Sequence, residues 1–126
     1  MKIKNVTIGI KSVKNVLQDV QDVMERIERG EKVGRKKPGV YFENLDVMRK
    51  AITSERLRLL KVIKENHPES LYELAKMLER NLKNVSDDVR YLADLGLIEL
   101  SKGKTNGRER TTPVVRYEKI RVEIAV

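Results

Sequence analysis

Apolar residues recur every three or four positions in three consecutive segments of the second half of the chain. The first segment begins behind Thr53 or Ser54, either of which can cap a helix, and Pro68 prevents it from continuing. The second opens with SLYE, a capping box in which Ser70 and Glu73 can each accept a hydrogen bond from the other's backbone N–H. The pattern therefore predicts two helices, of which the second is short, joined by a brief loop.

A third helix is predicted over residues 82–95, because Asn81 is a favourable N-cap and Gly96 a favourable end. At about 100° per residue the segment separates into two faces. The core face contains Leu82, Val85, Val89 and Leu92, with Leu95 on its flank. The opposite face contains Lys83, Asp87, Arg90 and Asp94, with Asn84, Tyr91 and Ser86 at its edges. Asp88 falls toward the core flank, where it could pair with a neighbouring helix, whereas Asp87 points outward and could pair with Lys83 or Arg90.

Strand patterns follow this helix. The dipeptide Asn106-Gly107 strongly favours a type I′ hairpin, because both positions tolerate positive φ. The flanking segments 97–103 and 111–117 are the predicted hairpin strands, and Pro113 belongs on an edge. Alternating residues in 118–126 predict a last strand.

The first thirty residues carry a separate pattern. Residues 2–10 alternate and predict a strand, and a helix is expected behind Ser12 and before Gly30. Its apolar stripe contains Val13, Val16, Leu17, Val20, Val23, Met24 and Ile27. The other side carries Asp19, Asp22, Glu25 and Glu28, so this helix is not expected to lie on a polyanion. Its stripe must be buried against its own domain or against a second subunit.

Glycine, proline and basic residues between 30 and 39 predict a linker, followed by the short extended segment VYFE and a short helix behind Asn44. The predicted organisation is a strand–helix element in 1–30 for dimerisation or partner binding, a basic linker in 31–43, and a domain in 44–126. The strand–helix element could alternatively fold back on the sheet of the predicted hairpin, with strand 2–10 beside strand 118–126.

The net charge of +8 is concentrated in two short segments. Residues 44–101 carry ten basic and ten acidic side chains, and so contribute nothing to it. Residues 32–37 carry four bases and no acid, and residues 102–110 carry four bases and one acid. Basic charge concentrated on loops suits contact with a polyanion, although basic loops also promote solubility.

Composition excludes several kinds of function. The chain has no cysteine and one histidine, His67, for which we expect a surface or capping role, so neither a thiolate site nor a multi-histidine metal site is expected. No apolar run approaches the roughly 18 residues that span a bilayer, and no signal peptide opens the chain. Adjacent carboxylates such as Asp87 and Asp88 diverge on a helix and form no catalytic pair. We therefore expect a soluble, cytoplasmic protein that is not an enzyme and needs no metal or cofactor.

The predicted order of helix, helix, turn, helix and basic hairpin is that of a helix-turn-helix with a wing, an α+β fold with an N-terminal strand–helix extension. A helix fits the major groove of DNA, and the hairpin reaches the backbone or the minor groove. The candidate DNA contacts are Lys83, Asn84, Ser86, Asp87 and Arg90 on the helix and Lys102, Lys104, Arg108 and Arg110 on the hairpin. Arg90 could bind guanine and Asn84 adenine, while the hairpin bases should contact phosphates. Lys36 and Lys37 could add phosphate contacts. The alternative for the helix is a solvated face of alternating charge.

The pattern L-x-x-L-A-x-x-L followed by N-V-x-x-D-V-x-x-L-x-x-L-G-L-I, found here from Leu71 to Ile98, resembles that of prokaryotic winged helix-turn-helix regulators of the MarR/ArsR-like type. The chain is most similar to a small group of predicted regulators, some encoded near toxin genes, that begin with a strand–helix segment and ERGE. The resemblance implies that Lys83, Asn84, Ser86, Asp87 and Arg90 lie on the groove-facing helix. The cysteines of metal-sensing relatives are missing.

The expected function is sequence-specific binding of double-stranded DNA by a dimeric transcriptional regulator, a repressor, with helix 82–95 in the major groove and hairpin 102–110 as the wing. The rival is an antitoxin or other protein-interaction module whose N-terminal helix binds a cognate toxin or another protein. A third alternative is a winged helix that binds only protein.

Overall fold

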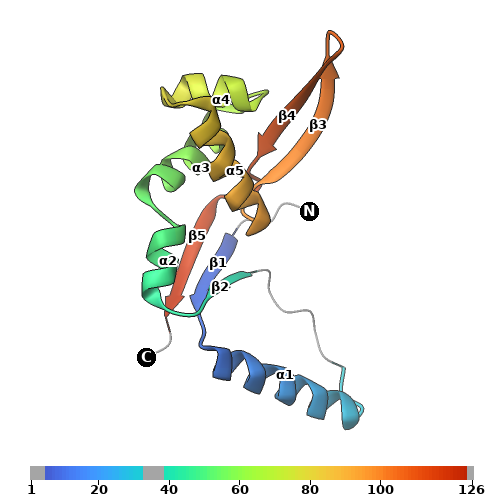
Figure 1. Ribbon diagram of the computed structural model, residues 1–126. Coiled ribbons are helices and arrows are strands. Elements are labelled where there is room, and N and C mark those ends of the chain that lie inside the picture. The colour runs from blue at the N-terminus through green and yellow to red at the C-terminus, as the bar shows by residue number, and fades with distance from the viewer. Residues whose placement is uncertain (1–4, 33–38, 125–126) are drawn as a thin grey trace. The chain divides into compact units, whose positions relative to one another are not determined.

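A computed structural model of the chain describes residues 5–32 and 39–124 (Figure 1). The described residues form two compact units: a helical unit, residues 52–118, and a sheet unit, residues 5–32, 39–51 and 119–124. The class is α+β, as predicted, and the helical unit has the winged helix-turn-helix order. The division differs from the predicted one, because the short helix after residue 44 and the last strand belong to the sheet unit. Residues 33–38 of the predicted basic linker, which include Lys36 and Lys37, lie outside the described residues.

The helical unit contains α3 (Ser54–Asn66), α4 (Leu71–Leu78) and α5 (Leu82–Asp94), followed by the hairpin strands β3 (Glu99–Thr105) and β4 (Arg108–Val114). Figure 1 shows the hairpin extending as a two-stranded ribbon beyond the helices of this unit. All three predicted helices are therefore confirmed, and α4 is the shortest of them, as expected.

Each of these helices begins behind a predicted cap. The side-chain oxygens of Thr53, Ser70 and Asn81 accept hydrogen bonds from backbone N–H groups of the first turn. The capping box differs in one bond, because Glu73 Oε2 accepts from the N–H of Glu69 at 3.3 Å, one residue before Ser70. The hydrogen bonds of Ser70 and Glu73 therefore hold both the first turn of α4 and the end of the loop before it.

Two helix ends have a conformation that the sequence did not indicate. His67 and Glu79 follow α3 and α4 in the left-handed region, with φ of 48° and 54°. Glycine or asparagine usually occupies this position, so neither residue type signals such an end. The predicted capping role of His67 is thereby confirmed, since its backbone N–H closes the helix on the carbonyl of Ile63.

The core of the helical unit is built from one face of each helix and from the residues flanking the hairpin. Its buried apolar residues are Leu59, Leu60, Ile63, Leu74, Ala75, Leu78, Val85, Val89, Leu92, Leu97, Ile98, Val115 and Tyr117. Leu82 was expected on the core face of the third helix, but it is 44% exposed, because it is the first residue of α5.

The hairpin turn confirms the sequence signal. Asn106 and Gly107 both have positive φ, 54° and 77°, as a type I′ turn requires. The strands lie closer to this turn than predicted, pairing from Thr105 with Arg108 back to Glu99 with Val114. The segments 97–98 and 115–117, predicted as parts of the strands, instead lie outside them, and their apolar residues Leu97, Ile98, Val115 and Tyr117 belong to the core.

Tyr117 is a buried phenol whose hydroxyl has no hydrogen-bond partner among the described residues. Burial raises the pKa of Tyr117 from 10.0 to about 12. The Tyr117 hydroxyl therefore loses its proton near pH 10 in the unfolded chain and near pH 12 in the folded chain. As pH rises from 10 to 12, ionisation favours the unfolded chain, so the free energy of unfolding falls.

We expect this difference to lower the free energy of unfolding by about 1.4 kcal/mol between pH 9 and pH 11. The measurement is urea denaturation of the wild type and Tyr117→Phe at both pH values, and the difference between the proteins isolates this group from the other titrations. Tyr117→Phe should be neutral or slightly stabilising at pH 7, because it removes an unpaired buried hydroxyl. If the free energy of unfolding falls equally with pH in both proteins, Tyr117 is not the group that causes the fall.

The sheet unit is a three-stranded parallel sheet of order β2-β1-β5, formed by β2 (Gly39–Phe42), β1 (Asn5–Ile10) and β5 (Lys119–Ile124). The predicted strands 2–10 and 118–126 are confirmed within the described residues, and so is the alternative that they lie side by side. The part of that alternative that joined this pair to the hairpin sheet is wrong, because β1 and β5 form a sheet separate from β3 and β4. The predicted extended segment VYFE corresponds to β2.

One face of this sheet is apolar and the other polar, because side chains alternate along each strand. Ile8 is 1% exposed on the central strand, whereas Val122 and Ile124 on the edge strand β5 are each 53% exposed. The unit also contains α1 (Val13–Glu28) and α2 (Leu45–Ala51). Ser12 caps α1, as predicted. Within the described segments, no helix combines the length and the apolar character that a bilayer crossing demands.

Candidate nucleic-acid interface

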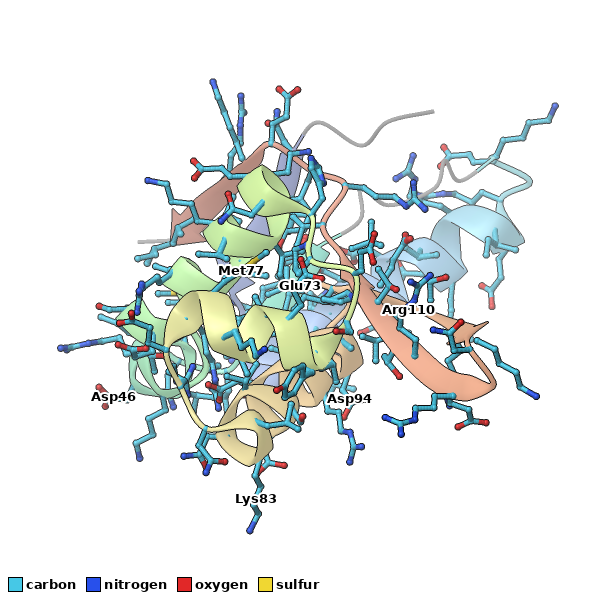
Figure 2. The ribbon with its side chains drawn as sticks, turned by 90° about the horizontal axis from the view of Figure 1, so that it is seen from above. Asp46, Glu73, Met77, Lys83, Asp94 and Arg110 are labelled. Atoms are coloured by element: carbon cyan, nitrogen blue, oxygen red, sulfur yellow. The ribbon has the colours of Figure 1, made fainter. Side chains whose placement is uncertain are left out.

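Helix α5 has an inner face that is fully buried at its centre and an exposed outer face. Val85, Val89 and Leu92 are each 0% exposed and fix the rotation of the helix about its axis. The predicted contact residues Lys83, Asn84, Asp87 and Arg90 are exposed, and we refer to these four as the outward face of α5. Figure 2 shows the Lys83 side chain extending away from the ribbon at the start of the helix. The sequence thus predicted correctly which side chains point outward.

The edges of this face are less exposed. Ser86 is half-buried, so it is less accessible than its neighbours. Tyr91 is 38% exposed, and the guanidinium of Arg56 in α3 lies over its ring, 4.1 Å from the centroid. Tyr91 is therefore held by a cation–π contact, which favours a packing role for this residue.

The outward face carries balanced charge. Lys83 and Arg90 are offset by Asp87 and by the nearby exposed Asp94. Among the residues that the structure describes, Asp87 makes no ion pair with Lys83 or Arg90. Such a surface has little net attraction for phosphates, but its mixed donors and acceptors suit hydrogen bonding to base edges.

Asp88 has a different role from its neighbour. Its Oδ1 accepts from Arg56 Nε at 3.2 Å, and its Oδ2 accepts from Arg80 Nη2 at 2.8 Å. The three side chains are only 17–23% exposed, so this is a partly buried cluster. The predicted pairing of Asp88 with a neighbouring helix is confirmed.

This cluster joins three parts of the unit. Arg56 belongs to the first turn of α3, Arg80 follows the end of α4, and Asp88 is in the middle of α5. Arg80 Nε also lies 3.8 Å from Glu55 Oε2. The sequence indicated that Asp88 would have a partner but did not identify Arg56 or Arg80, since neither lies on a pattern that points to α5. The cluster fixes the position of α5 on the two helices before it.

The hairpin distributes its four bases over two faces. Residues two apart on a strand share a face, as do residues directly paired across strands. Lys102 and Lys104 therefore lie on one face with Glu109, which pairs with Lys104. Arg108 and Arg110 lie on the other. Lys102, Lys104 and Arg108 are exposed, as expected for side chains that contact phosphates.

Arg110 is the exception among these bases. Its side chain is half-buried, and its Nη1 lies 3.5 Å from Glu69 Oε2 in the loop between α3 and α4. Thr112 Oγ1 on the same face donates to the carbonyl of Glu69 at 2.6 Å. Figure 2 labels Arg110 on the hairpin. Arg110 and Thr112 anchor the hairpin to this loop, so a phosphate contact by Arg110 stays a prediction that requires the Glu69 pair to open. No pattern in the sequence points to Glu69 as this anchor.

Three helices with a buried inner face on the third, followed by a basic hairpin, define the class of winged helix-turn-helix proteins. Residues 51–122 match the HVO_A0114 family, and because this match covers more than half of the chain, the chain belongs to that family.

The solved structures that are similar to this chain include two regulators from prokaryotes. One is named a possible transcriptional regulator from Methanosarcina mazei Go1, with 21% identity, a TM-score of 0.45, and coverage of 59% of this chain and 66% of that one. The other is a MarR-like transcriptional regulator from Thermotoga maritima, with 14% identity, a TM-score of 0.45, and coverage of 83% and 65%. The chain spans just under two thirds of the length of both. No curated protein matches it.

Proposed function

We propose that this protein binds double-stranded DNA sequence-specifically and regulates transcription, with α5 in the major groove and the β3–β4 hairpin as the wing. One observation carries the proposal. Val85, Val89 and Leu92 on the inner face of α5 are fully buried, while its outward face presents hydrogen-bonding side chains in the same unit as a hairpin with exposed bases. An exposed helix of this kind matches the width of the major groove.

The outward face of α5 supplies the donors and acceptors that base edges require. Arg90 can donate two hydrogen bonds to guanine, and Asn84 can exchange two with adenine. Asp87 can accept from the amino group of cytosine, which a positively charged residue cannot do. Lys83, at the first turn, and the half-buried Ser86 can contact phosphate or base edges.

The wing is proposed to supply affinity. Lys102, Lys104 and Arg108 are exposed, and lysine or arginine contacts to phosphate attract DNA without regard to sequence. We propose a role in binding rather than in catalysis, with no cofactor. A small protein that binds a promoter acts most simply by blocking it, so we infer a repressor. The sequence pattern from Leu71 to Ile98 supports placing it with MarR-like regulators.

The test is fluorescence anisotropy with DNA from upstream of the protein's own gene and with a scrambled duplex of equal length. The wild type should prefer its own DNA. Arg90→Ala should reduce this preference about 10- to 100-fold, because one bidentate base contact discriminates by about 1–3 kcal/mol. Arg58→Ala is the matched control, since it removes the same charge from an exposed position on α3.

Two results would overturn the proposal. One is a wild type that binds both duplexes equally and only weakly. The other is an Arg90→Ala protein whose preference equals that of Arg58→Ala, which would remove α5 as the element that recognises sequence.

A protein-interaction module, such as an antitoxin, is the second candidate. It is supported by α1, whose apolar stripe is exposed in the described structure. Failure of every duplex to bind, together with capture of a protein encoded next to this gene, would favour it.

A further inference from the structure

The apolar stripe of α1 has no partner within the described part of its own chain. The side chains of Val16, Leu17, Val20, Met24 and Ile27 are 42%, 64%, 48%, 60% and 59% exposed. Five large apolar residues on one side of a 16-residue helix form a contiguous surface of the kind that marks a binding site for another protein.

The position of α1 in the chain makes this exposure unusual. It connects two parallel strands of one sheet, β1 and β2. The helix in such a connection normally covers the sheet with its apolar side. Here the stripe does not do so, and Figure 1 shows α1 leaving the end of β1 instead of lying over the strands.

The spacing of the stripe is that of a helix pair. Val16, Val20, Val23 and Ile27 alternate steps of four and three residues, as the a and d positions of a heptad do. Leu17 and Met24 lie beside this seam, seven residues apart on the same side. On the other side of the seam lie Asp19 and Arg26, also seven apart.

Orientation follows from these flanking residues. In an antiparallel pair, Val16 of one copy packs against Ile27 of the other, and Val20 packs against Val23. Asp19 of each copy then faces Arg26 of the other on one side of the seam, and Leu17 faces Met24 on the opposite side. A parallel pair would instead place Asp19 beside apolar Met24. Only the antiparallel arrangement therefore places opposite charges beside each other and apolar side chains beside each other.

Both charged residues already have intrachain partners. Asp19 accepts from Lys11 Nζ at 2.9 Å, and this hydrogen bond raises the pKa of Lys11. Arg26 Nε donates to Glu31 Oε2 at 3.1 Å, and both side chains of that pair are 50% exposed. Exposed pairs of this kind are weak, so Arg26 can exchange Glu31 for Asp19 of a second copy at little cost.

We propose that α1 pairs antiparallel with α1 of a second copy of this chain, forming a two-fold symmetric dimer. Such an interface is isologous, and its symmetry matches that of a palindromic DNA site. The use of the dimer on DNA rests on the proposed function, whereas the pairing itself does not. Two helices of about 24 Å bury a small area, so the dimer is weak in isolation and is strengthened when both copies bind one duplex.

The test is sedimentation equilibrium of the full chain over a concentration series without DNA. The wild type should show a monomer–dimer equilibrium. Arg26→Glu, which places like charges across the seam, should raise the dissociation constant at least tenfold. Asp19→Lys/Arg26→Glu should restore it to within about threefold of the wild type. Arg49→Glu, which makes the same charge change on exposed α2, should have no effect.

Leu17→Lys tests the apolar side of the seam and should likewise raise the dissociation constant at least tenfold. Far-ultraviolet circular dichroism establishes that each variant keeps its helix content. A wild type that is monomeric at every concentration overturns the proposal, as does a dimer that survives both Arg26→Glu and Leu17→Lys. Failure of the double variant to restore association overturns the antiparallel orientation. Because no DNA is present, these outcomes are independent of the anisotropy result.

Discussion

Asp88→Ala should lower the free energy of unfolding of the helical unit by about 3 kcal/mol. The carboxylate accepts from Arg56 and from Arg80, and all three side chains are at most 23% exposed. Removing it leaves two guanidinium groups close together without the acid between them. Breaking a buried ion pair from one side costs about 3–5 kcal/mol, and the partial exposure of this cluster places the loss at the low end.

The control for this variant is Asp87→Ala, one residue earlier in the same helix. It removes the same group from an exposed position without an ion pair to Lys83 or Arg90, so its effect should stay within about 0.5 kcal/mol of zero. Urea denaturation followed by circular dichroism at pH 7 measures both. Equal effects of the two substitutions would show that the cluster contributes nothing to stability.

Two adjacent aspartates thus have opposite expected roles. Asp88 fixes α5 against Arg56 and Arg80, and Asp87 is free to meet a base. Asp87→Ala should therefore change which DNA is bound without changing stability, and Asp88→Ala should do the reverse. The 100° that separates neighbouring residues on a helix is sufficient to produce this difference.

Features determined by nearby residues could be predicted from the sequence. The caps Thr53, Ser70 and Asn81 each depend on a side chain within three residues of the N–H group that it accepts from. The type I′ turn depends on the Asn-Gly pair alone. The buried and exposed faces of α5 follow from a period of 3.6 residues, which needs no knowledge of the neighbouring elements.

Features determined by residues far apart in the chain could not be predicted with certainty from the sequence. The pairing of β1 with β5 joins residues more than 100 positions apart, and an alternating pattern indicates a strand but not its neighbour. The same limit applies to Arg56 and Arg80 as partners of Asp88 and to Glu69 as the anchor of Arg110. The stripe of α1 shows the converse, since its sequence requires a partner while the described chain provides none.

Lys104→Ala/Arg108→Ala should have the largest effect on DNA affinity. The outward face of α5 balances Lys83 and Arg90 against Asp87 and the nearby Asp94, so attraction to phosphate must come from elsewhere, and these exposed hairpin bases are placed to provide it. Loss of two phosphate contacts should reduce the slope of log K against log salt by about 1.8 and weaken binding most at low salt.

The preference for the protein's own DNA over scrambled DNA should survive in this variant, because phosphate contacts carry no sequence information directly. Anisotropy titrations from 50 to 200 mM salt measure the slope and the preference together. Arg58→Ala/Lys61→Ala removes the same charge from exposed positions of α3 and should leave the slope unchanged. If the two double variants have the same salt slope, Lys104 and Arg108 of the hairpin do not contact the DNA phosphates. If the hairpin variant instead loses the preference and keeps the slope, the wing is the element that recognises sequence and α5 is not.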